Sequence, residues 1–155
     1  MDAELINPFI KSVENVITTM AGISMTMEKP SIKRDNRTWG EVSGIIGLAG
    51  NQATGNMILS FDQPSILAIV SGMLGESFTT IDAQVTDAVG ELTNMVSGGA
   101  KGALSEKGYY FEMATPIILV GKDIEIKQLS KDPIVLVPFV TETGKFVLEA
   151  SLTKD

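Results

Sequence analysis

The chain has 155 residues, of which 44% are hydrophobic and 20% charged, and this composition predicts one folded domain over residues 1–155. Twelve Lys and Arg against nineteen Asp and Glu give a net charge of -7, which argues against nucleic acid or an anionic membrane surface as a partner. The sequence has no cysteine and no histidine, which excludes disulfides, thiolate nucleophiles, imidazole metal sites and Ser-His-Asp triads.

The first predicted element is an amphipathic helix. Leu5, Phe9 and further apolar residues recur every three or four positions, which predicts a helix over residues 3–21 that ends at Gly22. The following residues, 27–39, are polar and include a proline and a cluster of charges. They predict either a solvated loop or a short strand with an exposed turn.

A hairpin and a second helix are expected next. Two apolar runs, residues 41–48 and 54–61, flank the turn-forming residues 50–52 and predict two antiparallel strands. A second helix is predicted to begin at residues 63–65, where a proline suits the first turn. Gly75 is expected to end this helix.

The longest helical pattern runs from residue 82 to about residue 107. Asp82 suits its N-cap, and a continuous apolar stripe predicts that one face of the helix is buried. Beyond this helix, four runs rich in β-branched and aromatic residues predict strands over 109–120, 124–129, 134–140 and 145–152. The order of elements predicts a single α+β domain, in which an antiparallel sheet carries the long helix and two further helices.

Nothing in the sequence predicts export or insertion into a membrane. The first four residues include two acidic and no basic side chains, and no apolar run approaches the roughly 18 residues of a membrane span. The lack of cysteine fits a reducing compartment. We therefore expect a cytoplasmic protein that binds neither nucleic acid nor membrane.

The face of the long helix opposite its apolar stripe carries polar and small residues: Asp87, Glu91, Asn94, Gly98 and Lys101. Glu91 and Asn94 stand one turn apart, so a carboxylate lies beside an amide, and the pair could bind a cation and orient a water. The spacing alone is weak evidence, because Glu4 and Asn7 repeat it where the first helix is only beginning. The alternative is an ordinary solvated helix face.

The sequence around this pair is more specific than its spacing. Residues 87–101 read DAVGELTNMVSGGAK, and they closely resemble the signature helix of the CheC/CheX/FliY family of chemotaxis phosphatases. The order and length of the predicted elements, including a strand pair with Gly47 and Gly55, are similar to a CheX-like domain over nearly the whole chain. The helix after residue 63 carries no Glu-x-x-Asn, and this single copy resembles the CheX-like branch of the family.

This resemblance implies an enzyme that hydrolyses the aspartyl phosphate of a CheY-like response regulator. The regulator's receiver domain brings its own Mg²⁺ and lysine, so no cofactor and no metal are expected on this chain. By the same resemblance, Asn94 orients the attacking water and Glu91 docks to the receiver lysine. The resemblance also implies a homodimer joined through edge strands of the sheet.

Three more residues of this helix face are candidates for docking the receiver, namely Asp87, Gly98 and Lys101. For Asp87 the alternative is simple compensation of the helix dipole. For Gly98 and its neighbour Gly99, close approach of the receiver and tight packing against the sheet are both open.

Two other classes of function stay open at this point. One is a non-catalytic module that uses the same helix face to bind a receiver and sequester it. The presence of both Glu91 and Asn94 favours the phosphatase, because a sequestering protein does not need an amide to orient water. The other is a fold relative that serves a signalling pathway outside chemotaxis, since neither the cognate receiver nor the pathway can be recognised in this sequence.

Overall fold

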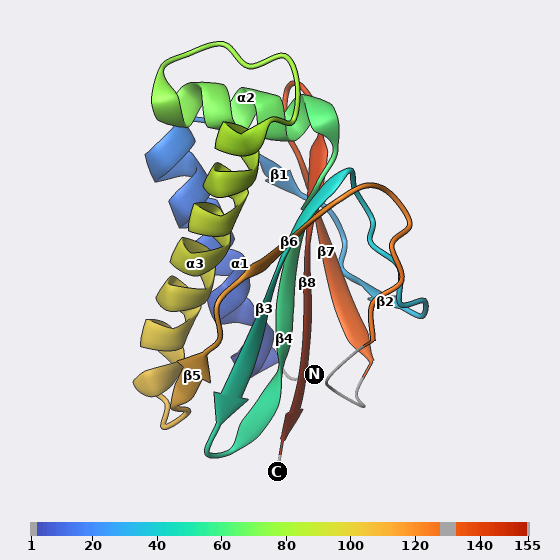
Figure 1. Ribbon diagram of the computed structural model, residues 1–155. Coiled ribbons are helices and arrows are strands. Elements are labelled where there is room, and N and C mark those ends of the chain that lie inside the picture. The colour runs from blue at the N-terminus through green and yellow to red at the C-terminus, as the bar shows by residue number, and fades with distance from the viewer. Residues whose placement is uncertain (1–2, 128–132, 155) are drawn as a thin grey trace.

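The centre of the sheet is the predicted hairpin. In the computed structural model, which describes residues 3–127 and 133–154, β3 (Val42–Gly50) and β4 (Ala53–Phe61) pair antiparallel along their length (Figure 1). Alternate side chains of each strand point to the same face of a sheet, so one face of this hairpin lies in the core. The two predicted strands and their antiparallel pairing are confirmed.

Six further strands extend this hairpin within the described residues: β1 (Thr26–Met27), β2 (Ser31–Lys33), β5 (Phe111–Met113), β6 (Ile117–Val120), β7 (Ile134–Val140) and β8 (Lys145–Lys154). The strand order is β1-β7-β8-β4-β3-β5, with β2 also paired to β7 and β6 also paired to β3. All pairings are antiparallel. One edge of the sheet is therefore formed by β1 and β2, and the other by β5 and β6.

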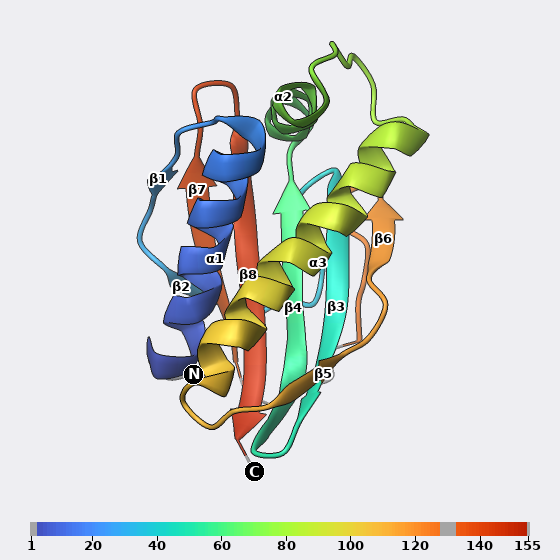
Figure 2. The same ribbon diagram turned by 90° about the vertical axis from the view of Figure 1, so that its left-hand side faces the viewer.

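One face of the sheet is covered by three helices: α1 (Ala3–Ala21), α2 (Gln63–Leu74) and α3 (Ala83–Ser105). Figure 2 shows α1 and α3 side by side across the strands, and α2 at the end of the sheet where β4 stops. Phenylalanine rings fill part of the layer between helices and sheet. Phe146 stacks on both Phe61 and Phe139, with ring centroids 5.3 Å and 5.2 Å apart, and all three are fully buried.

The ends of the helices follow local signals in the sequence. Gly22 and Gly75, after α1 and α2, have φ angles of +66° and +70°, which glycine adopts without strain. Asp82 is the N-cap of α3, and its carboxylate accepts a hydrogen bond of 2.9 Å from the Val85 amide. The three predicted helices are confirmed. None of the helices among the described residues is long and apolar enough to cross a bilayer.

The run over residues 109–120 was predicted as one strand, and this is wrong. β5 pairs with residues 48–50 of β3, whereas β6 pairs with residues 42–45 of the same strand. Residues 114–116 separate the two strands. The Ala114 amide still donates a hydrogen bond of 3.1 Å to the Gly47 carbonyl, but Pro116 has no N–H to donate to the ladder, and the register of pairing with β3 shifts by one residue between the two strands.

The strand predicted over residues 124–129 is also wrong for its described part. Residues 124–127 form only an isolated bridge to the loop before β3, and the last two predicted residues lie outside the described chain. The Ile126 amide donates a hydrogen bond of 2.7 Å to the Asn36 carbonyl. This segment therefore runs along a loop rather than along the sheet, which a pattern of alternating residues does not reveal.

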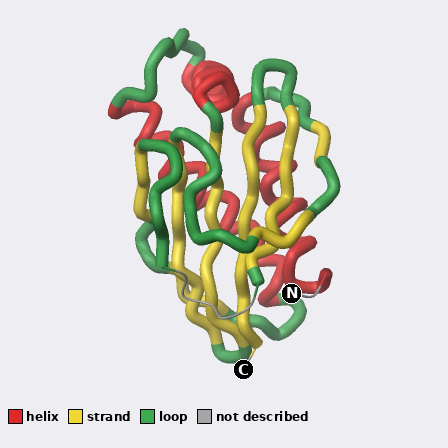
Figure 3. The backbone as a smooth tube through the Cα atoms, turned by 90° about the vertical axis from the view of Figure 1, so that its right-hand side faces the viewer, coloured by secondary structure: helices red, strands yellow, loops and turns green. Residues whose placement is uncertain are grey.

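The second face of the sheet lies beneath loops. Residues 27–39 contain the end of β1 and all of β2, both paired with β7, and an exposed turn follows, so the strand-and-turn alternative is confirmed with two strands instead of one. Figure 3 shows loops crossing this face of the sheet. Under this cover Ser43 and Ser60 are fully buried, and the Ser60 hydroxyl accepts a hydrogen bond of 2.7 Å from the Gly40 amide.

Candidate functional site

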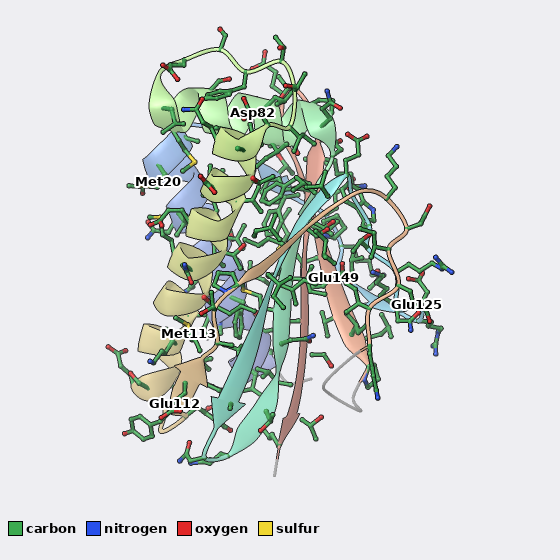
Figure 4. The ribbon with its side chains drawn as sticks, in the orientation of Figure 1. Met20, Asp82, Glu112, Met113, Glu125 and Glu149 are labelled. Carbon is green, nitrogen blue, oxygen red and sulfur yellow. The ribbon has the colours of Figure 1, made fainter. Side chains whose placement is uncertain are left out.

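The orientation of α3 is fixed by the face that it buries. Its N-cap, Asp82, is labelled in Figure 4, and the buried residues of the helix are Val85, Ala88, Val89, Leu92, Thr93, Val96, Ser97, Ala100 and Leu104. This stripe packs against α1 and β3. Because an α-helix has 3.6 residues per turn, the positions opposite the stripe are held at the surface of the molecule.

The structure places all five candidate residues on this outer face of α3. The side chains of Asp87, Glu91, Asn94 and Lys101 are exposed, and Gly98 is partly exposed. Their spacing of three or four residues puts them along one line on the helix. In Figure 2 this face points toward the viewer, with α1 on one side and β5 and β6 on the other.

Glu91 and Asn94 are not used by the fold. Within the described residues, neither side chain makes a hydrogen bond or an ion pair. The Ser97 hydroxyl reaches the backbone carbonyl of Asn94, at 3.1 Å, and not its side chain. No group of three His, Cys, Asp or Glu side chains in the described chain could hold a metal ion. The chemistry offered by this face is therefore that of a carboxylate acceptor next to an amide that both donates and accepts.

Neighbouring elements flank α3 on both sides of this pair. On one side, the Ser12 hydroxyl of α1 donates a hydrogen bond of 2.7 Å to the Val96 carbonyl. On the other side, Gly90 faces β6, and a Cβ at this position would lie 3.7 Å from Ile118 Cδ1, an ordinary van der Waals distance. The exposed face of α3 thus lies between α1 on one side and β6 on the other.

Gly98 and Gly99, for which both close approach of a partner and tight packing were open explanations, differ in their surroundings. A Cβ at Gly99 would overlap the Ser12 hydroxyl, so tight packing explains this glycine, although the neighbour is α1 and not the sheet. A Cβ at Gly98 would meet nothing within 4 Å. A glycine destabilises a helix by about 1 kcal/mol relative to alanine. No contact within the described chain requires a glycine at position 98, so the packing of this chain does not explain it.

One contact beneath the site was missed by sequence reasoning. Thr93 is fully buried on the inner side of the turn that carries Glu91 and Asn94, where it faces Gly44 of β3. A side chain at Gly44 would overlap the Thr93 hydroxyl. No local sequence pattern predicts this contact, because the two residues come from elements far apart in the sequence.

A groove lies beside the site but does not contain it. It has a volume of about 710 Å³ between α1 and the C-terminal half of α3, and Asn15, Gly99 and Lys107 are among its lining residues. Neither Glu91 nor Asn94 lines it. The pair stands on a convex helix, and a convex surface suits a macromolecule with its own cleft better than it suits a small molecule.

Known proteins resemble this chain in sequence. The family model described as "Chemotaxis phosphatase CheX" matches residues 42–140, a range that contains Glu91 and Asn94. The CheY-P phosphatase CheX of Thermotoga maritima is 31% identical over 128 residues, which are 82% of each chain.

Solved structures resemble the fold over almost its full length. A CheC-like superfamily protein from Shewanella sp. PV-4 gives a TM-score of 0.92 at 45% identity and covers 99% of both chains. The chemotaxis protein CheX from Vibrio vulnificus gives 0.90 at 42% identity, over 97% of this chain and 100% of its own. CheX in a CheX–CheY–BeF3–Mg²⁺ complex from Borrelia burgdorferi shares the fold, with a TM-score of 0.81 at 24% identity over 96% and 97% of the two chains. The chain belongs to the chemotaxis phosphatase CheX family.

Proposed function

We propose that this chain is a phosphatase that hydrolyses the aspartyl phosphate of a CheY-like response regulator, with Glu91 and Asn94 as its working residues. Membership of the CheX family supports the activity, as does the name CheY-P phosphatase of the Thermotoga maritima relative. The observation that carries the assignment of residues is the exposed pair on α3, whose side chains have no partner among the described residues.

The two residues perform different tasks in this proposal. The phosphoryl group is bound to a receiver aspartate as a reactive acyl phosphate, so the phosphatase mainly has to position a water for in-line attack. The Asn94 amide enters the receiver's active site and orients this water. The Glu91 carboxylate pairs with the receiver lysine, which docks α3 and fixes the register of Asn94.

Three neighbouring residues extend the docking surface in this proposal. Asp87 and Lys101 add exposed charges one or two turns from the central pair. Gly98 keeps the helix surface low beside Asn94, since a side chain there would project into open space. The receiver would use that space to approach the helix backbone.

The metal belongs to the substrate in this mechanism. We place Mg²⁺ on the receiver, where it would neutralise charge on the phosphoryl group; in the described part of this chain, no group of three His, Cys, Asp or Glu side chains could hold a metal ion. The Borrelia burgdorferi structure is of a complex that contains CheY, BeF3 and Mg²⁺. The chain itself then needs no cofactor: it supplies an amide and a carboxylate to a metal site on its partner.

The setting we propose is a cytoplasmic homodimer in which each chain forms one domain over residues 1–155. The sheet edge formed by β5 and β6 supports a dimer contact, because Ile117 and Val120 of β6 are 62% and 57% exposed. An exposed apolar edge strand is a template for pairing with a second copy.

The experiment follows the decay of a phosphorylated CheY-like receiver in the presence of Mg²⁺, with and without this protein. We expect Asn94→Ala to lower kcat about 100-fold or more while leaving the affinity for the BeF3-activated receiver within about threefold, because the amide acts on the water and not on docking. We expect Glu91→Ala to weaken that affinity about tenfold, since it removes an interfacial ion pair.

Glu4 and Asn7 supply matched controls. They repeat the Glu-x-x-Asn spacing on α1, and both side chains are exposed. Glu4→Ala and Asn7→Ala should leave rate and affinity unchanged. Full activity in Asn94→Ala would refute the assigned mechanism. Binding of the receiver by the unmutated protein without faster decay would instead identify the sequestering module.

A further inference from the structure

Beneath the turn that carries Glu91 and Asn94, α3 lies against the backbone of β3. Gly44 of β3 faces Thr93 there. A methyl group at Gly44 would overlap the Thr93 hydroxyl and would lie 3.2 Å from Thr93 Cβ and 3.3 Å from Val89 Cγ1. Rotation of the hydroxyl, which donates a hydrogen bond of 2.7 Å to the Val89 carbonyl, would not remove the two carbon contacts. The helix therefore sits as close to the strand as a glycine allows.

A second contact of this kind holds the following turn of α3 from the side. Gly99 faces Ser12 of α1, and a methyl group at Gly99 would overlap the Ser12 hydroxyl and lie 3.3 Å from Ser12 Cβ. The same hydroxyl donates a hydrogen bond of 2.7 Å to the Val96 carbonyl. Each contact joins a glycine to a small hydroxyl residue, and each lies less than two helical turns from Asn94.

We propose that these two glycine contacts, Gly44–Thr93 and Gly99–Ser12, set how far Asn94 projects from the molecule and thereby determine the rate of phosphate hydrolysis. The four residues are positioning residues in this proposal: Gly44 and Ser12 touch α3 from β3 and α1, Thr93 lies on the inner side of α3, and Gly99 lies on the side that faces α1. This inference rests on the proposed function of Asn94.

The height of α3, meaning how far its outer face stands above the neighbouring elements α1 and β6, matters because one helix face is a small docking surface. A stable protein–protein interface buries about 800 Å² on each partner, which is more than two turns of an exposed helix provide. A receiver centred on Asn94 therefore also rests on the elements that flank α3, namely α1 and β6. The height of α3 relative to these two supports decides how deeply the amide of Asn94 reaches into the receiver's active site.

An added methyl group would change this height by a small amount that still matters. Carbon atoms pack best at about 3.5–4.0 Å, so an alanine at position 44 pushes the Thr93 turn outward by about 0.5 Å. Groups that act on the reacting atoms must be held within about 0.5 Å of their productive positions, and a misplacement of 1 Å lowers rates about 100-fold. The ion pair of Glu91 tolerates the shift better, because both of its side chains are flexible.

The test is a set of compensating variants. We expect Gly44→Ala to lower kcat about tenfold and to change KM for the phosphorylated receiver less than about threefold. Adding Thr93→Ala removes the overlap with the hydroxyl but leaves the contacts with the Cβ of residue 93 and with Val89 Cγ1, so the double variant should recover part of the lost kcat when it is compared with Thr93→Ala alone. A residue with only a structural role would lower the melting temperature without lowering the kcat of the folded protein.

The second contact provides an independent pair of variants. Gly99→Ala should lower kcat in the same way, and Ser12→Ala should restore part of it, because the overlap with the hydroxyl is gone and the nearest remaining atom is Ser12 Cβ at 3.3 Å. If Gly44→Ala fails to fold, this pair still tests the proposal. Recovery of kcat in either double variant supports the inference.

Gly72→Ala is the matched control for overpacking. A methyl group at Gly72 of α2 would overlap the backbone carbonyl of Ala21, away from α3. We expect this variant to lower the melting temperature but to leave kcat unchanged. The inference is overturned if folded Gly44→Ala and Gly99→Ala keep the kcat of the unmutated protein, or if Gly72→Ala loses as much kcat as they do. Lack of activity in the unmutated protein would refute the proposed function instead.

Discussion

At the scale of single residues, Glu149 of β8 is a carboxylate buried on the second face of the sheet, and it is labelled in Figure 4. It is 1% exposed, and its Oε1 accepts a hydrogen bond of 2.8 Å from the Lys33 ammonium of β2. Its Oε2 has no hydrogen-bond partner among the described residues. Burial raises the pKa of Glu149 above its ordinary value, and the bond to Lys33 offsets this only in part.

The raised pKa predicts how stability depends on pH. The folded protein binds the Glu149 proton more tightly than the unfolded chain does, so the favourable contribution is complete below the ordinary pKa of 4.5. It is lost as pH rises through the raised pKa. We expect Glu149→Gln to remove this part of the decline, because the amide carries no proton to lose. Urea unfolding between pH 4.5 and pH 8 measures the effect.

The comparison that decides this prediction is the difference between the two proteins at each pH. The free energy of unfolding of the unmutated protein should fall relative to that of Glu149→Gln as the pH rises. A constant difference over the whole range would show that Glu149 does not titrate differently in the folded state.

At the scale of elements, Asp62 is the N-cap of α2 and also joins this helix to the sheet. Its Oδ1 accepts a hydrogen bond of 2.8 Å from the Ser65 amide, and its Oδ2 accepts one of 2.9 Å from the Lys145 amide at the start of β8. The cap of α3 is simpler, because Asp82 accepts a single bond from Val85. The two N-caps therefore differ in what they hold together.

This difference predicts unequal losses of stability. Loss of an N-cap destabilises a protein by about 0.5–2 kcal/mol, so we expect Asp82→Ala to lower the free energy of unfolding by about 1 kcal/mol and Asp62→Ala by about 2 kcal/mol. Asp62→Asn should fall between Asp62→Ala and the unmutated protein, because its single carbonyl oxygen can replace only one of the two acceptors. Denaturation in urea gives these values. Equal losses at Asp62 and Asp82 would contradict the role of Asp62 in joining α2 to β8.

At the scale of the whole molecule, the two sheet edges differ in exposed apolar surface. The β5–β6 edge exposes Ile117 and Val120 of β6, at 62% and 57%. The opposite edge exposes Met27 and Ile32, at 44% and 48%, on two shorter strands. The β6 edge is accordingly the better template for a second copy of the chain.

A charge on this edge should prevent the proposed dimer. We expect Ile117→Lys to convert a dimer into a monomer, because the lysine would be buried without a partner when two edges pair. Sedimentation equilibrium measures the association. Ile32→Lys on the opposite edge is the matched control and should leave the mass unchanged; loss of the dimer in this control alone would move the contact to the β1–β2 edge.

Local sequence patterns were sufficient to predict those elements whose formation depends on their own residues. The helical spacing before Gly22 and the cap at Asp82 predicted α1 and α3, since periodicity and capping act within a few turns. The outer face of α3 followed from the same periodicity, and so the sequence alone placed Glu91 and Asn94 side by side at the surface.

Only the tertiary structure could decide features that join distant parts of the chain. The division of residues 109–120 into β5 and β6 depends on where each piece meets β3. The alternation around Glu149 places it on the second face of the sheet, but its burial and its bond to Lys33 of β2 depend on residues far away in the sequence. Likewise, Gly44 lies under Thr93 only because α3 crosses β3 at that point. Sequence therefore determined the helices and the exposed pair, whereas long-range packing determined the strand order, the buried carboxylate and the height at which that pair is held.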